Sequence, residues 1–564
     1  MNVVLVYRGR YHVREALDLE TLSAVLRGGG HDVTLVYDPD TFGVTDNVFQ
    51  LPALARLLAG EQRTVAEILA AQPDAVVFSA LSSTYAWCRR IAAAVRRQPS
   101  APVIFLGLHP SLVPEQVARD ALVDYTIAGE AENVINPLLQ RLRLRGPVDD
   151  VGNLWYRRNG QPVHTYRAAL VDLDALPLPD KDLFAPYASH RYSYAAMVSG
   201  GCPYQCTFCE ETCLKRLYGG KYFRPKGVDT VIRELAAGKK RYRYREVIFK
   251  DSYLSGDKRW LGQLMSRFRR EIGVPFKCFA TISAFDHQTA RLLKEGGCYS
   301  VEFGLQTWND RLRREILNRP ETSEDARRVF GLCDKHRLWY DVDPMFHLPT
   351  ETEEDHARGA VCYRGLRYLG RIKVHYLVYQ PTAEILRHAA AGDVPAEVSR
   401  QLAEGCESDF YSQTSGSAEK REVVAGYAAL YKILPLVPAW LLRWLLRGDR
   451  RPDRRSDPRC PAAGGGRFAL LRHPPRGPRP DAAGAAGLAA VADRAGRTAR
   501  LCRSGPHDGA VHRGRLRPGG RGRRVAGDVV REDRAGRRGG PGPRDRLPRR
   551  GPRADRPRAR FPRN

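Results

Sequence analysis

One stretch of the sequence decides how this chain is interpreted: Ser199-Gly200-Gly201-Cys202-Pro203-Tyr204-Gln205-Cys206-Thr207-Phe208-Cys209. Its cysteines have the spacing Cys-x3-Cys-x2-Cys and follow a strand-like run, Ser193 to Ser199. Thiolates are soft ligands that favour iron–sulfur clusters and zinc. Three of them can hold a 4Fe-4S cluster and leave one iron open for another ligand. We therefore predict a 4Fe-4S cluster on Cys202, Cys206 and Cys209.

Two other interpretations of these cysteines are open. A structural zinc site prefers two separated cysteine pairs, which this loop lacks. A ferredoxin-type cluster needs a fourth thiolate, for which Cys213 is available. Ferredoxin runs use Cys-x2-Cys-x2-Cys with a proline after the last cysteine, whereas Leu214 follows Cys213 here. The spacing therefore favours the open iron, and Cys213 is the residue that tests it.

Strand-like runs alternate with helical patterns on both sides of the loop. After Ser193 to Ser199 they are Glu246 to Lys250, Phe276 to Ile282, Ser300 to Leu305, Trp339 to Phe346 and Lys373 to Tyr379. Six βα units predict a partial (β/α)6 TIM-type barrel over residues 192–380, with its chemistry at the carboxyl ends of the strands. Residues 381–448 are predicted to be helical and to cover the barrel mouth.

The cysteine loop in this setting resembles that of the radical S-adenosylmethionine enzymes, in which Phe208 would be the aromatic residue before the last cysteine. The resemblance implies that S-adenosylmethionine binds the open iron and is cleaved by one electron to a 5′-deoxyadenosyl radical. It also implies cofactor contacts for Phe208, Asp251 and Glu302. Asp251 ends the second barrel strand, where Lys250 replaces the first acid of the family pattern, and helix capping is its alternative role.

The end of the fifth barrel strand carries a related pattern. The run from Phe346 to Glu354 resembles the Gly-Leu-Pro-Gly-Glu-Thr-Glu-Glu run of the same family. His347 and Thr350 stand in place of its two glycines. Close backbone approach to adenine at this edge is therefore in question.

Residues 1–144 are predicted to form an α/β domain with a doubly wound, Rossmann-like parallel sheet. Its strand-like runs are Val3 to Tyr7, Asp32 to Tyr37, Ala75 to Ser79, Val103 to Leu106 and Tyr125 to Ala128. Ligands of such sheets bind beyond the carboxyl ends of the strands. We therefore expect a ligand site at the loops after the first, third and fourth strands.

This domain resembles the cobalamin-binding module of one branch of these enzymes. Ser79-Ala80-Leu81 matches the Ser-x-Leu of the module, Gly107 the first residue of its Gly-Gly pair, and Gly129-Glu130 the start of its Gly-Glu-x-Glu. The resemblance implies that cobalamin contacts Ser79, Leu81, Gly107, Gly129 and Glu130. His12 lacks the acid and glycine of the module's cobalt-ligand motif, so no histidine of that type is expected on cobalt. A domain that no longer binds a corrinoid is the alternative.

Residues 145–191 are predicted to be a connector with a hairpin at Asn159-Gly160. Residues 449–564 are predicted to be a disordered tail rich in Arg, Pro, Gly and Ala. Residues 451–564 hold 31 of the arginines and no lysine, and all four of these residue types have codons built from G and C alone. The tail is therefore either an Arg-rich nucleic-acid-binding extension or the translation of a shifted reading frame, and the second is favoured.

The net charge of +28 would by itself suggest nucleic acid or an anionic membrane as a partner. The tail contributes +21 of it, so the first 450 residues carry only +7 and nucleic acid is not expected as a partner. We see no signal peptide and no membrane span, and expect a cytoplasmic protein. Twelve cysteines without a secretion signal indicate reduced or metal-bound thiols.

Together these features predict a cobalamin-dependent radical S-adenosylmethionine methyltransferase. Its expected substrate is a small, biosynthetic molecule methylated at an unactivated carbon or a phosphinate. Its expected electron donor is an external one-electron reductant of the flavodoxin or ferredoxin type. A cobalamin-dependent cyclase or rearrangement enzyme, and a corrinoid or redox sensor, are the alternatives. No catalytic side chain is assigned from the sequence.

Overall fold

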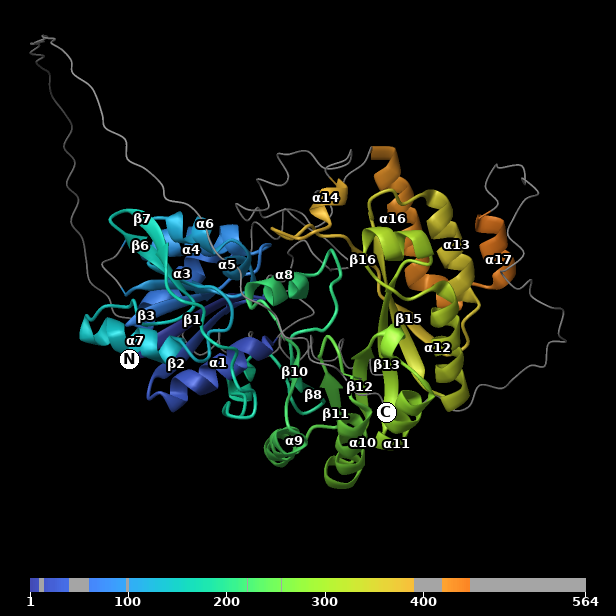
Figure 1. Cartoon of the computed structure of the whole chain (residues 1–564), viewed down its shortest axis with the longest axis horizontal. Helices are drawn as coiled ribbons and strands as arrows, with labels where there is room; N and C mark the ends of the chain where they lie inside the picture. The colour runs from blue at the N-terminus through green and yellow to red at the C-terminus, as the bar shows by residue number, and fades with distance from the viewer. Residues whose placement is uncertain are drawn as a thin grey trace, which may run out of the picture. The chain divides into compact units, whose positions relative to one another are not determined.

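The computed structural model describes residues 1–9, 15–39, 60–97, 101–220, 222–254, 256–389 and 418–446. Two sheets with helices packed around them lie within one unit, residues 1–462 (Figure 1). The interpretations of His12 and of the 449–564 tail concern residues outside those described.

The first sheet has the strand order β2-β1-β3-β4-β5-β6-β7, and its first five strands are parallel. The strands are β1 (Asn2–Arg8), β2 (Asp32–Asp38), β3 (Ala75–Ser79), β4 (Val103–Leu106), β5 (Tyr125–Ile127), β6 (Leu154–Arg158) and β7 (Gln161–His164). The helices are α1 (Leu17–Gly28), α3 (Glu61–Ala70), α4 (Tyr85–Val95), α5 (Leu108–Leu112), α6 (Pro114–Arg119) and α7 (Ile135–Leu144). The predicted hairpin is β6-β7, and it extends this sheet by antiparallel pairing with β5.

Helices cover both faces of this sheet, because successive residues of a strand point to opposite sides. Val3 and Leu5 pack in a hydrophobic cluster with α1 and α7, whereas Val4 and Val6 pack with α3, α4 and α6. Figure 1 shows α1 and α7 on one side of this sheet and α3, α4 and α6 on the other. The predicted doubly wound α/β domain is therefore confirmed. Its candidate ligand-binding edge is formed by the loops that follow β3 and β4.

The second sheet has six parallel strands in sequential order, as predicted for a partial barrel. They are β8 (Ser193–Ala196), β11 (Glu246–Phe249), β12 (Phe276–Ala280), β13 (Cys298–Gln306), β14 (Trp339–Phe346) and β15 (Leu369–Ile372). The main helices are α9 (Val228–Tyr242), α10 (Lys258–Arg267), α11 (His287–Gly296), α12 (Ser323–His336), α13 (Glu353–Arg364), α14 (Leu386–Ala389), α16 (Ala418–Ile433) and α17 (Ala439–Leu445). Shorter turns are η1 (Lys181–Phe184), η2 (Phe268–Ile272), η3 (Ile282–Ala284), η4 (Leu312–Ile316) and η5 (Leu434–Leu436).

Two strand boundaries differ from the sequence prediction. The sixth strand lies at Leu369–Ile372, earlier in the chain than predicted, because Leu369 and Ile372 pair with β14. Within the predicted range, the short strand β16 (His375–Tyr376) also pairs with β14. The first barrel strand ends at Ala196. Ser199–Gly200 instead forms β9, which pairs antiparallel with β10 (Arg224–Pro225) at the start of the cysteine loop.

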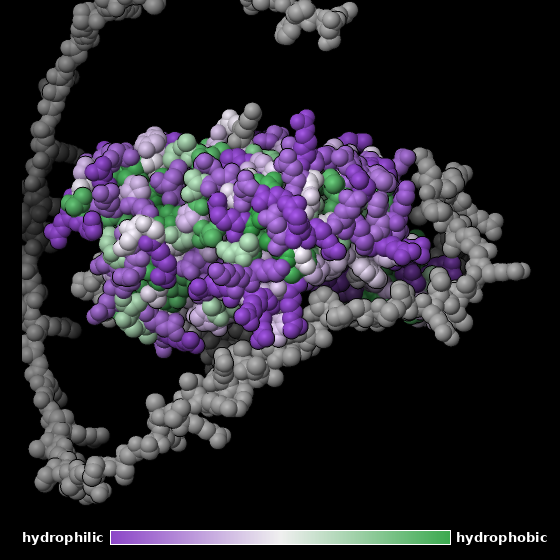
Figure 2. Space-filling model, turned by 90° about the horizontal axis from the view of Figure 1, so that it is seen from below, coloured by the Kyte–Doolittle hydropathy of each residue, from purple (hydrophilic) through white to green (hydrophobic). Residues whose placement is uncertain are grey.

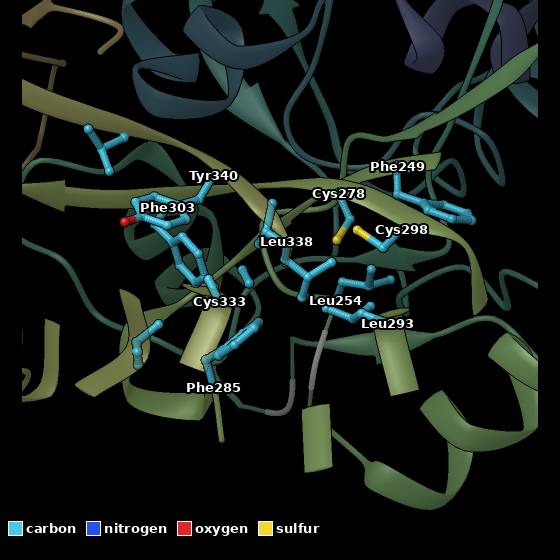
Figure 3. Close-up of a cluster of buried hydrophobic side chains, with 14 of the residues drawn as sticks. Phe249, Leu254, Cys278, Phe285, Leu293, Cys298, Phe303, Cys333, Leu338 and Tyr340 are labelled. Atoms are coloured by element: carbon cyan, nitrogen blue, oxygen red, sulfur yellow. The ribbon is translucent and has the colours of Figure 1, made fainter. Parts of the chain in front are cut away.

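The hydrophobic core of the second domain lies between this sheet and the helices that follow its strands. Figure 3 shows part of it, with Phe249, Cys278 and Phe303 contributed by β11, β12 and β13. The residues between these positions point to the other face of the sheet. That other face faces the barrel interior.

The helices after β13 and β14 begin with capping boxes, Thr322 with Asp325 and Thr352 with Asp355. In the loop after β14, His347 and Thr350 have φ of 65° and 61°. These are the two positions where the family run has glycine. His347 and Thr350 thus adopt the left-handed conformation that glycine adopts more easily, and each costs about 1–3 kcal/mol of folding free energy.

Hydrophilic side chains cover most of the face seen in Figure 2, with smaller hydrophobic areas between them. Among the described residues, no helix combines the length and the apolar character that crossing a bilayer requires. The apolar helix α17, for example, has only seven residues and ends at Leu445.

Candidate cofactor sites

The cysteine loop runs from β9 to α8 (Glu210–Leu217), and Cys209 is the residue before that helix. Thr207, in the middle of the loop, is hydrogen-bonded to two distant segments. Its hydroxyl donates to the Ile316 carbonyl, and its carbonyl accepts from the Ile385 amide at 3.0 Å. Asn318 also donates to the Gln205 carbonyl at 2.9 Å. The loop therefore has a defined conformation before any cofactor arrives.

The three predicted ligands are partly exposed free thiols. Burial raises the pKa of all three, that of Cys202 to about 11. The Arg319 guanidinium, whose Nη1 lies 4.0 Å from the Cys206 sulfur, opposes this shift at Cys206. Such thiols keep their protons until a metal replaces them. An iron–sulfur cluster would supply that positive charge, so the donor set fits one.

The spacing of ligand atoms distinguishes a cluster from a single ion. Among the described residues, only Glu15, Glu20 and His190 bring three ligand atoms within 4.8 Å of one another. Lys181 already forms ion pairs with both acids of that group, since its ammonium lies 2.6 Å from Glu20 and 3.6 Å from Glu15. The cysteine sulfurs do not form such a group, and each cysteine of a 4Fe-4S cluster binds a different iron. A single zinc ion, with Zn–S bonds of about 2.3 Å, would need the three sulfurs closer together than they lie in this structure.

Cys213 lies on α8, one turn after Cys209, and is buried in a hydrophobic cluster with Leu112 and Leu348. Phe208 packs against the same cluster. Cys213 is thus a packing residue in this structure. Phe208 secures the loop next to the last ligand, and its predicted contact with the cofactor remains a prediction.

Asp251, a predicted cofactor-binding residue, is fully buried at the end of β11. Its Oδ1 accepts from the Val198 amide at 2.8 Å and from the Ser199 hydroxyl at 2.6 Å. It therefore braces the strand that leads into the cysteine loop. Burial raises the pKa of Asp251 to about 6, and the hydrogen bonds from Ser199 and Val198 only partly oppose this.

Asp251→Asn should make the barrel less sensitive to pH. The folded pKa lies above the unfolded value, so the contribution of Asp251 to stability is full below about pH 4 and is lost as pH rises through about 6. Asparagine resembles the protonated acid and does not titrate. We expect the variant to gain about 2–3 kcal/mol relative to wild type between pH 4 and 7. Urea unfolding at several pH values measures this, and parallel pH profiles would contradict it.

Glu302, for which a cofactor contact is predicted, forms ion pairs across the sheet. Lys277 lies 3.0 Å from its carboxylate, and Lys373 donates to the same oxygen. Burial opposes its ionisation, but Lys373 and Lys277 outweigh burial and lower the pKa of Glu302 to about 2. Its role toward S-adenosylmethionine remains a prediction.

Ser79 and Gly107 meet where the first sheet is predicted to bind its ligand. The Ala80 amide donates to the Leu106 carbonyl at 2.9 Å, and the His109 amide donates to the Ala80 carbonyl at 3.0 Å. Gly107 has φ of +100°, and a Cβ there would lie 3.1 Å from the Ala80 backbone. The partly buried Leu81 begins the turn before α4. Small residues therefore keep these two loops in contact.

His109 carries a polar atom that suits a ligand at these loops. Its Nδ1 lies 3.1 Å from the Ser82 hydroxyl, and its ring contacts that of Tyr85 in a tilted arrangement, with the centroids 4.2 Å apart. Burial lowers the pKa of His109 to about 4, so the ring is neutral at pH 7. Its buried Nε2 has no hydrogen-bond partner among the described residues. An unsatisfied buried nitrogen beside Gly107 is compatible with a polar ligand such as the nucleotide tail of cobalamin.

Gly129 and Glu130 join the first domain to the second. The Glu130 amide donates to the Tyr218 hydroxyl at 2.6 Å, and its carboxylate accepts from Arg224 and from the Val171 amide. A side chain at Gly129 would collide with the Tyr218 hydroxyl. These two residues therefore contact the segment that follows the cysteine loop, and their predicted contact with cobalamin remains untested.

Sequence reasoning missed two residues of this region, Arg319 and Tyr218. Arg319 lies 113 residues from Cys206 along the chain, and Tyr218 lies 88 residues from Glu130. No local motif marks either of them. Only the pairing of strands and the packing of α8 bring them to their partners.

Two family models match the chain. The B12 binding domain matches residues 3–139, and the Radical SAM superfamily matches residues 197–358. These matches agree with the predicted cofactors, namely a 4Fe-4S cluster, S-adenosylmethionine and cobalamin.

Two curated methyltransferases are similar to part of this chain. An uncharacterised methyltransferase of Pyrococcus horikoshii is 26% identical over 45% of this chain and 55% of its own length. Cytidylyl-2-hydroxyethylphosphonate methyltransferase of Streptomyces wedmorensis is 23% identical over 39% of this chain and 47% of its own length. The chain thus spans about half the length of these curated relatives.

A solved structure shares the fold. The radical S-adenosylmethionine methyltransferase TsrM from Kitasatospora setae, with cobalamin and a 4Fe-4S cluster bound, aligns with a TM-score of 0.58 and 17% identity. The alignment covers 76% of this chain and 88% of TsrM. With both domains matched in the predicted order, this chain carries a B12 binding domain followed by a domain of the Radical SAM superfamily.

Proposed function

We propose that this chain is a cobalamin-dependent methyltransferase that methylates an unactivated carbon, or a phosphinate, of a small molecule. The curated relatives that it matches include methyltransferases, one of them named for a phosphonate. An external one-electron reductant of the flavodoxin or ferredoxin type is part of the proposal.

The observation that carries this proposal is the packing between the two candidate cofactor sites. Leu108 and Leu112 of α5, next to Gly107, share a hydrophobic cluster with Phe208 of the cysteine loop and Cys213 of α8. The hydrogen bond between Glu130 and Tyr218 adds a second connection. The loops proposed to hold cobalamin and the cluster are thus parts of one packed region. The proposed reaction requires this, because the radical generated beside the cluster and the methyl group carried by cobalamin would have to reach the same substrate carbon or phosphorus.

When bound, the cluster would supply the electron that cleaves S-adenosylmethionine, and cobalamin would carry the methyl group. Overall, one R–H, two S-adenosylmethionine cations and two electrons give R–CH3, 5′-deoxyadenosine, methionine and S-adenosylhomocysteine. Atoms and charge balance in this equation.

The residues of the chain position these groups. Cys202, Cys206 and Cys209 would hold the cluster, and Asp251 fixes the strand before them through Val198 and Ser199. Phe208 and its hydrophobic cluster exclude water from one side of the loop. The loops after β3 and β4 would hold cobalamin.

Product stoichiometry tests the proposed reaction. Reconstituted, reduced enzyme should be incubated with methyl-labelled S-adenosylmethionine and a panel of small phosphonates, phosphinates and carboxylates. A substrate should yield labelled product, 5′-deoxyadenosine and S-adenosylhomocysteine in equal amounts.

The alternatives give different products. Formation of 5′-deoxyadenosine with substrate conversion but without methyl label or S-adenosylhomocysteine would favour a cyclase or rearrangement enzyme. A sensor would consume no S-adenosylmethionine under reduction.

A further inference from the structure

The face of the second sheet that points away from its helices is charged. On β12, β13 and β14 the core-facing residues include Cys278, Val301 and Tyr340. Side chains between these positions, Lys277, Glu302 and Asp341, contact one another across the strands on the opposite face. Barrel interiors are usually filled by branched apolar side chains. Lys277, Glu302 and Asp341 already satisfy one another, so a ligand of this face would have to bind a charged group that lacks such a partner.

The charged side chains on this face differ in their exposure to solvent. The carboxylates of Glu302 and Asp341 are only 4% and 6% exposed, whereas the side chains of Lys373 and Arg371 are 31% and 49% exposed. Burial and the neighbouring Glu302 raise the pKa of a further acid, Asp343, well above its usual range. Lys277 is buried with these acids, its side chain only 9% exposed. The more exposed charges on this face are therefore the cations Lys373 and Arg371.

Lys250 adds a cation to this layer without a matching acid. It is an exposed residue directly after β11, and its ammonium lies 5.7 Å from the centre of the Phe279 ring. The Lys373 ammonium lies 5.9 Å from the same ring. Within the described part of the chain, no carboxylate forms an ion pair with Lys250. Two ammonium groups therefore share one aromatic ring, and of these two Lys373 is the one with an ion pair among the described residues, to Glu302.

We propose that Lys250 and Lys373 bind an anionic oxygen group, a phosphonate, phosphate or carboxylate, of the small-molecule substrate. This inference rests on the proposed function, since it places the substrate in the barrel. Two like charges near one ring repel each other, and a bound oxyanion removes that repulsion while accepting hydrogen bonds from both ammonium groups. The carboxyl end of β11 is also the edge at which barrel enzymes bind their substrates.

Binding of methylphosphonate to the reconstituted protein, measured by calorimetry without reductant, tests this site. Lys250→Gln should raise the dissociation constant roughly five- to tenfold, because one charge-assisted hydrogen bond is lost. Lys250→Arg should retain most of the affinity. Lys240→Gln is the matched control, since it removes the same charge from an exposed position on α9, outside the barrel. It should leave binding unchanged.

Ligand controls identify what is bound. Dimethyl methylphosphonate has a similar shape but no charge and should bind much more weakly than methylphosphonate. Acetate is titrated in parallel as a carboxylate. Whichever of the two anions, methylphosphonate or acetate, loses more affinity in Lys250→Gln identifies the class of substrate.

Three outcomes would overturn the proposal. These are unchanged methylphosphonate affinity in Lys250→Gln, equal binding of the neutral diester, and a loss of S-adenosylhomocysteine affinity in place of anion affinity. The last would assign Lys250 to the amino-acid part of S-adenosylmethionine. Because no turnover is measured, failure of the methyl-label experiment would leave this result standing, and the two proposals fail separately.

Discussion

Replacing Cys202, Cys206 or Cys209 by alanine, one at a time, should remove the iron–sulfur cluster and reduce cleavage of S-adenosylmethionine to background. Each cysteine provides one of three thiolates, so a single loss leaves an iron without its protein ligand. Iron and sulfide content, visible absorption and the yield of 5′-deoxyadenosine under reduction measure the effect.

Cys213→Ala is the matched control for this experiment. Its sulfur is buried among Leu112, Leu348 and their neighbours, so the change leaves a small apolar cavity costing about 1 kcal/mol. We expect this variant to keep its cluster and its cleavage activity. Equal damage from Cys213→Ala would replace the open-iron site by a ferredoxin-like site with four thiolates.

The parts of the fold that the sequence predicts correctly depend on local patterns. Five β-rich runs with helices between them suffice for the first sheet, and the cysteine spacing identifies the loop after the first barrel strand. The hairpin at β6-β7 also follows from its turn residues. Its place in the sheet does not, because it depends on the open edge of β5, whose backbone groups need partners.

The parts that the sequence does not predict depend on contacts between distant segments. Glu302 looks like a free polar residue beside the cofactor until β12 and the segment after β15 bring Lys277 and Lys373 to it. Likewise, Glu130 looks like part of a cobalamin motif, yet its amide meets Tyr218 of the second domain. A motif indicates which residues matter, but only the packed structure shows which partners they already have.

Gly107→Ala should weaken cobalamin binding by about tenfold or more and also destabilise the first domain. At φ of +100° any side chain is strained, and here the new Cβ would lie 3.1 Å from both the amide nitrogen and the carbonyl oxygen of Ala80. Backbone atoms cannot rotate aside, so the loops after β3 and β4 must move apart. Spectroscopic titration with hydroxocobalamin and urea unfolding measure the two effects.

Gly30→Ala is the control that separates the backbone strain of a left-handed residue from the steric collision of its new Cβ. Gly30 has φ of +77° in the same domain, but nothing lies within 4 Å of a Cβ built there. It should therefore cost only the left-handed strain, about 1–2 kcal/mol, and leave cobalamin affinity at the wild-type value. If Gly107→Ala bound cobalamin as tightly as Gly30→Ala does, the loops after β3 and β4 would not be the cobalamin site. Absence of binding in the wild type as well would instead indicate a domain that keeps the fold without the corrinoid.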